Sequence, residues 1–169
     1  MQPNKWSAAA TSGLLLALVT IVYTLIQTVF ELPTAVTLIL WAGKLFVTLW
    51  LLLSFIKDYS QQFDLFTYKN GLYFGFLTSF LSSVICAGYM FLHYSVLFPD
   101  SIAEQMEAAM IMLSSDPEAV ENLLMLEAKL PQIMFAASIV YYSLFGFIAS
   151  LIIANYTKKG DFFSDTPSV

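Results

Sequence analysis

The sequence predicts an all-α, polytopic membrane protein: a bundle of four transmembrane helices, with an extramembrane amphipathic helical hairpin between the third and the fourth. The chain of 169 residues is 59% hydrophobic and has a mean hydropathy of +0.75. Only 11% of its residues are charged, whereas soluble domains carry about 25%. So few charges cannot cover the surface of a soluble protein, so we expect lipid to surround much of the chain.

Four apolar stretches are each long enough to cross a hydrocarbon core of about 30 Å. We place the spans at residues 7–30, 34–56, 71–98 and 131–156, with a tail at 157–169, and treat 1–169 as one domain. The first stretch exceeds the apolar region of a signal peptide, and no cleavage site follows it. The turn that ends at Pro33 is so short that the first two spans form an antiparallel hairpin.

Lysines in the loops and tails predict the orientation of the spans. With the N-terminus in the cytoplasm, the inner side carries Lys5, Lys57, Lys69, Lys158 and Lys159. The outer side then carries only Lys129. The positive-inside rule therefore puts both termini in the cytoplasm.

The segment at 99–130 is acidic and is too polar to cross the membrane. Ser101 with Glu104, and Ser115 with Glu118, match capping boxes that start two short helices. Each helix has an apolar face, and the first is rich in methionine. The carboxylates form a candidate outer acidic surface: Glu104, Glu107, Glu118 and Glu121. This acidic surface has three alternative interpretations: a solvated face, a docking site for a partner, or a cation site. The sequence has no ligand spacing typical of a calcium-binding loop, so the cation site is the least supported.

Small residues recur at every fourth position of the third span, and the fourth span repeats the pattern. The candidate helix-packing stripe consists of Gly71, Gly75, Ser79, Ser83, Gly146 and Ser150. Small residues let helices approach closely in lipid. The stripe predicts packing of the third span on the fourth, or, as the alternative, a homodimer.

Lys44 is the one charged residue in the interior of a span. A lysine near the bilayer centre costs about 2.5–3.5 kcal/mol on insertion scales, so it should face the bundle interior or water. Depth counted along each helix puts Thr20, Tyr23, Ser83, Tyr141 and Tyr142 beside it, as a candidate midplane polar site. Their hydroxyls could hold the ammonium. Lys44 is then either a structural residue or the centre of a functional site.

Metal, cofactor and nucleic-acid sites are not indicated. The chain has one cysteine, Cys86, and one histidine, His93, which rules out thiolate and multi-histidine metal sites. We expect His93 to bond a hydroxyl or a headgroup at the outer end of the third span. There is no arginine, and the net charge is −5, so we expect no nucleic-acid partner.

The order and spacing of several membrane-boundary motifs resemble the family called domain of unknown function 4199. They are FIKDY at 55–59, FTYKNG at 66–71, FPD at 98–100, SLIIA at 150–154 and KK at 158–159. The resemblance covers most of the chain and implies a small four-span protein of the bacterial inner membrane, of the Bacteroidota type. It implies no activity, substrate or catalytic residue.

Three functional hypotheses remain open. The first is a non-enzymatic accessory or scaffold protein, whose partners are membrane lipid and another membrane protein or a second copy of itself. The second is a small transporter, channel or lipid-binding protein built around Lys44. The third is a membrane enzyme acting on a lipid-linked substrate, which ranks last because no catalytic motif is visible.

Overall fold

The protein is described by a computed structural model over residues 4–30, 32–114, 117–127 and 129–159, with the backbone alone at 102–105, 108, 113, 117 and 127. The helices are α1 (Lys5–Val29), α2 (Thr34–Ser60), α3 (Tyr68–Leu92), α4 (Asp100–Leu113), α5 (Pro117–Glu127) and α6 (Leu130–Thr157). A short π-helix, η1 (His93–Leu97), continues α3.

The predicted fold class is confirmed. Four candidate membrane spans, α1, α2, α3 with η1, and α6, are long and apolar enough to cross a bilayer. The short helices α4 and α5 lie between the third span and the fourth. These features indicate a multi-pass membrane protein.

Local chemistry sets the ends of the spans. Asn4 caps α1 because its side-chain oxygen accepts a hydrogen bond from the backbone N–H of Trp6 at 3.2 Å. Thr67 caps α3 in the same way through the N–H of Asn70, at 3.4 Å, so α3 begins at Tyr68 rather than at residue 71.

The capping box predicted at Ser101 is wrong. Helix α4 begins one residue earlier, at Asp100, and has no side-chain cap. The hydroxyl of Ser101 instead donates a hydrogen bond to the carbonyl of Phe98, 2.7 Å away, just before the helix. The second predicted capping residue, Ser115, lies outside the described residues.

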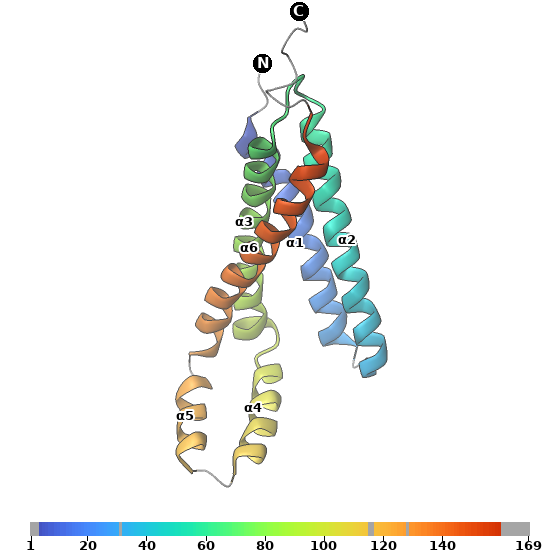
Figure 1. Ribbon diagram of the computed structural model, residues 1–169. Helices are drawn as coiled ribbons and strands as arrows, with labels where there is room; N and C mark the ends of the chain where they lie inside the picture. The colour runs from blue at the N-terminus through green and yellow to red at the C-terminus, as the bar shows by residue number, and fades with distance from the viewer. Residues whose placement is uncertain (1–3, 31, 115–116, 128, 160–169) are drawn as a thin grey trace, which may run out of the picture.

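The spans form two antiparallel pairs (Figure 1). Helices α1 and α2 make one pair, and α3 and α6 make the other. The pairs lie together at the end of the bundle that carries both chain termini and diverge toward the opposite end (Figure 1). Helices α4 and α5 continue beyond α3 and α6 as an extension, so the hairpin does not fold back over the bundle (Figure 1).

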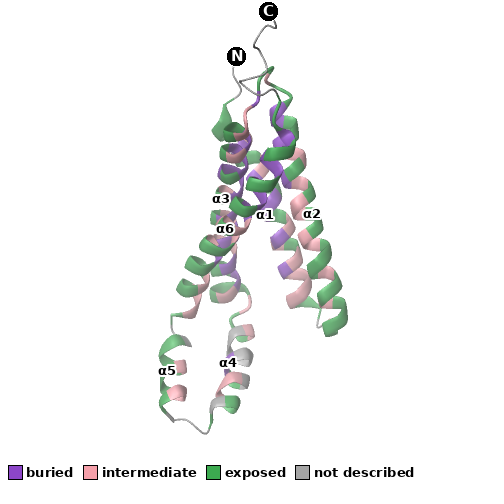
Figure 2. Cartoon of the chain, in the orientation of Figure 1, coloured by how far each residue is buried: buried purple, intermediate pink, exposed green. Residues whose placement is uncertain are grey.

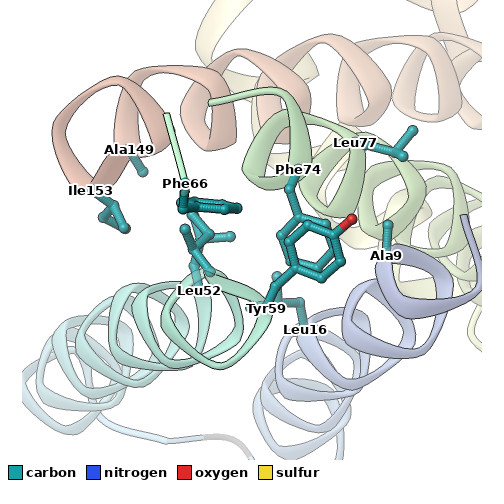
Figure 3. Packing of buried hydrophobic residues seen from close by; sticks show 10 residues of the cluster. Ala9, Leu16, Leu52, Tyr59, Phe66, Phe74, Leu77, Ala149 and Ile153 are labelled. Carbon is teal, nitrogen blue, oxygen red and sulfur yellow. The ribbon is translucent and has the colours of Figure 1, made fainter. Parts of the chain in front are cut away.

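Buried residues gather in the half of the bundle near the termini (Figure 2). Helix α3 is the central helix, with eleven buried residues, whereas α2 is peripheral, with four. An aromatic cluster fills the core at this end, where Tyr59 stacks on Phe74 with ring centroids 4.0 Å apart (Figure 3). Phe66, from the loop between α2 and α3, is fully buried beside them.

A single β-bridge ties the loop before α3 to the residues after α6. Phe66 and Lys159 exchange two backbone hydrogen bonds, at 3.2 and 2.8 Å. The Lys159 ammonium also donates to the carbonyl of Ser60 at 3.1 Å, at the end of α2. This end of the bundle is thereby closed by contacts between segments far apart in the sequence.

Candidate functional site

A cavity of about 50 Å³ lies beside Lys44, between α1, α2 and α6. Its walls are mainly aromatic and hydroxyl side chains. The lining residues are Thr20, Trp41, Lys44, Leu45, Thr48, Tyr141, Tyr142 and Phe145.

The Lys44 ammonium is held by two aromatic faces. Its nitrogen lies 4.6 Å from the ring centroid of Tyr23 and 5.6 Å from that of Tyr142. Such cation–π contacts contribute about 0.5–2 kcal/mol each. Within the part of the chain that the structure describes, the nitrogen donates no hydrogen bond and meets no carboxylate. Since an ammonium has three N–H donors, those of Lys44 stay available to the cavity.

The cavity is partly open to the surface of the bundle at α2 and α6. Two residues of its wall, Trp41 and Tyr141, are 46% and 61% exposed.

Five of the six residues predicted for the midplane site lie together: Thr20, Tyr23, Lys44, Tyr141 and Tyr142. The rings, rather than the expected hydroxyls, contact the ammonium. Ser83 is the exception, because it is fully buried and its hydroxyl lies 2.8 Å from that of Ser143. It belongs to the contact between α3 and α6.

Sequence reasoning missed several cavity residues. Trp41 and Thr48 precede and follow Lys44 by three and four positions, so they share its face of α2. Phe145 follows Tyr141 by four positions on α6. A helical projection around Lys44 and Tyr141 would have found all three.

The small-residue stripe lies in the contact between α3 and α6. A Cβ at Gly71 would meet the Cβ of Ala154 at 3.2 Å, and one at Gly75 would overlap the side chain of Ser150. A Cβ at Gly146 would overlap the side chain of Ser79. The α3 stripe is therefore covered by α6 of the same chain.

The outer acidic residues Glu107, Glu118 and Glu121 are exposed on the hairpin, and the side chain of Glu104 lies outside the described part of the chain. Among the described residues, no group of three or more histidine, cysteine, aspartate or glutamate side chains could hold a metal ion.

A family model described as protein of unknown function (DUF4199) matches residues 11–159. The chain belongs to this family. The match begins within α1 and covers the other three candidate membrane spans and the hairpin. Comparison with curated proteins and with solved structures gave no match. The function of this DUF4199 protein must therefore be argued from its geometry.

His93 in this family member is buried inside the protein, with 1% of its surface exposed. Its Nε2 lies 3.1 Å from the hydroxyl of Thr28, and its Nδ1 lies 3.0 Å from the hydroxyl of Tyr89. The expected hydroxyl partner is thus present, on both ring nitrogens. Because both nitrogens are used, His93 links α1 to the end of α3 as a structural residue.

Proposed function

We propose that this chain is a non-enzymatic protein of the bacterial inner membrane that binds the polar end of a bilayer-soluble ligand at Lys44. One observation carries the proposal. An ammonium inside a candidate membrane span keeps its hydrogen-bond donors available and faces a cavity whose wall includes the exposed side chains of Trp41 and Tyr141. Charged groups at this depth mark functional sites by default, since each is costly to keep there.

The ligand should present an anionic or strongly accepting oxygen. Lys44 offers N–H donors to the cavity, and the proton of the Thr48 hydroxyl is already used, because it donates to the Lys44 carbonyl at 2.8 Å. A cavity of about 50 Å³ has room for a few heavy atoms. A carboxyl group can therefore enter while its acyl chain stays between α2, α6 and the bilayer. A long-chain carboxylic acid is the ligand class that fits best.

The first prediction concerns the replacement of Lys44. We expect Lys44→Met to weaken binding of a fluorescent long-chain fatty acid to the purified protein about 10- to 100-fold, the loss for one hydrogen bond to a charged group. Fluorescence titration in mild detergent measures the change. Lys57→Met is the matched control, because Lys57 lies on the same helix, is exposed and does not line the cavity.

Equal affinity of the Lys44→Met and wild-type proteins would contradict the proposal. Lys44 would then be a structural residue held by Tyr23 and Tyr142. A matched fatty alcohol should bind more weakly than the acid, because it carries no charge for the ammonium to pair with.

An accessory or scaffold role is the second candidate, and one observation favours it. The hairpin exposes apolar side chains, with Ile111, Met112 and Met125 at 68%, 84% and 61% exposure. Methionine-rich apolar surfaces adapt to varied partners. Another membrane protein, or a second copy of this chain, could dock there. This candidate replaces the first if the Lys44 test fails.

The non-enzymatic assignment is supported by the position of the acidic residues. The hairpin extends away from the four spans (Figure 1), so Glu107 and Glu121 do not face the Lys44 cavity. No cofactor is needed for the proposed binding.

The second prediction concerns orientation, for which we propose that both termini face the cytoplasm. Ser114→Cys should react with a membrane-impermeant maleimide added to the outside of spheroplasts, and Gln62→Cys should react only after the membrane is opened. Both positions are exposed, and Cys86 can stay because it is only 2% exposed. The opposite labelling pattern would reverse the topology.

A further inference from the structure

A second cavity, of about 30 Å³, lies at the end of the bundle that carries the termini, and the Lys44 site does not use it. Four polar residues line it: Lys5 at the start of α1, Tyr59 near the end of α2, and Asn70 and Tyr73 in the first turns of α3. Three phenylalanines complete the wall. The cavity therefore combines an apolar floor with polar groups from three helices.

The hydroxyl of Tyr59 has no hydrogen-bond partner among the described residues, although the residue is only 3% exposed. Its ring is fixed on one face by the stack on Phe74 and at its edges by Phe63 and Phe66, with centroids 5.1 and 6.0 Å away. In Figure 3 the oxygen points toward the side on which Ala9 of α1 lies. A buried hydroxyl without a partner costs free energy, so a ligand that bonds it is favoured.

Lys5 lies one helical turn before Ala9, on the same face of α1. Lys5 and Tyr59 therefore line the cavity from neighbouring positions. Its other polar residues, Asn70 and Tyr73, also carry donors, and no carboxylate is part of the wall. A set of donors with one positive charge selects an anion.

We propose that this cavity binds the phosphate group of a phospholipid headgroup. The position supports a lipid source, because the cavity lies at the ends of three candidate membrane spans, where headgroups are found. Its volume holds the free oxygens of a phosphodiester, and the exposed side chains of Asn70 and Tyr73 leave the rest of the headgroup outside. Lysine commonly binds phosphate as a point charge.

The test measures phospholipid retained by the purified full-length protein, by native mass spectrometry with phosphatidylglycerol added in mild detergent. We expect Tyr59→Phe and Lys5→Met each to lower the bound fraction about tenfold, as for the loss of one hydrogen bond to a charged group. Tyr59→Phe keeps the stacked ring, so the core stays intact. Tyr156→Phe and Lys69→Met are the matched controls, because both residues are exposed at the same end and neither lines the cavity.

Addition of excess inorganic phosphate tests whether the bound phosphate group belongs to a lipid headgroup or to a soluble molecule. Retention of the lipid in excess phosphate supports a headgroup site, and displacement supports the phosphate site with a soluble occupant. The proposal is overturned if Tyr59→Phe and Lys5→Met both retain as much phosphatidylglycerol as the two controls. The cavity would then hold only water against Tyr59. Lys44→Met should leave this binding unchanged, because Lys44 lines the other cavity.

Discussion

Gly146→Ala should lower the free energy of unfolding by about 1–3 kcal/mol, the usual cost of overpacking a tight contact. The added Cβ would overlap the side chain of Ser79 and approach its Cα to 3.5 Å. The approach to the Cα is an ordinary contact, but the overlapped atoms include the Ser79 Cβ. Because a rotamer change cannot move a Cβ, α3 and α6 must separate. Gly75→Leu should be more damaging, because even a Cβ there overlaps Ser150 and lies 2.7 Å from Ile56.

Gly88→Ala is the control, on the central helix α3, against which Gly146 of α6 packs. A Cβ at this position has no neighbour within 4 Å, and alanine favours a helix over glycine by about 1 kcal/mol. Thermal unfolding in mild detergent should therefore show a loss of stability for Gly146→Ala and none for Gly88→Ala. If both variants melted alike, the close contact between α3 and α6 would be refuted.

The same variants separate the two interpretations of the stripe. If it packs α3 on α6 within one chain, Gly146→Ala changes the melting temperature at every protein concentration. If it formed a homodimer, the variant would instead lose self-association while the monomer kept its stability. The covering of Ser79 and Ser83 by α6 favours the first outcome.

Hydropathy and charge alone predicted the four spans, because a helix must satisfy its own backbone groups in lipid and needs a long apolar sequence. The two rings that contact the Lys44 nitrogen, Tyr23 and Tyr142, were also among the residues predicted for its site. Depth along a helix follows from the rise per residue, so Tyr23, Tyr141 and Tyr142 could be placed at its level. Which side-chain atoms face the ammonium depends on the side-chain rotamers and on the rotation of each helix about its axis. Neither could be predicted from the sequence.

Contacts that depend on a single residue were not predictable. The bridge between Phe66 and Lys159 joins positions far apart in the chain, and no periodic pattern indicates it. The close approach of α1 to α3 at Gly13, where a Cβ would lie 2.9 Å from the Thr78 carbonyl, was also missed, because an isolated glycine makes no stripe. The π-helix before Phe98 likewise has no sequence signature.

Phe66→Ala should lower the free energy of unfolding by about 3–5 kcal/mol, the usual cost of removing a buried phenylalanine side chain. Phe66 is 0% exposed, and its ring lies against Tyr59 and Phe63, with centroids 6.0 and 5.8 Å apart. The loop that carries it has no regular structure of its own, so this buried ring is its main apolar anchor.

Leu65→Ala is the control that distinguishes the loss of a buried side chain from a general effect of substitutions in this loop. Leu65 is the preceding residue but is 59% exposed, so its truncation should change the unfolding free energy by less than about 0.5 kcal/mol. Equal losses for the two variants would mean that the loop, and not the ring, determines stability. A loss confined to Phe66→Ala would show that the aromatic cluster holds the loop before α3 in place. The backbone bridge to Lys159 then fixes this loop against the residues that follow α6. Since Tyr59 packs against Phe66, the same variant should also release the Tyr59 ring and weaken phospholipid retention in the cavity at this end.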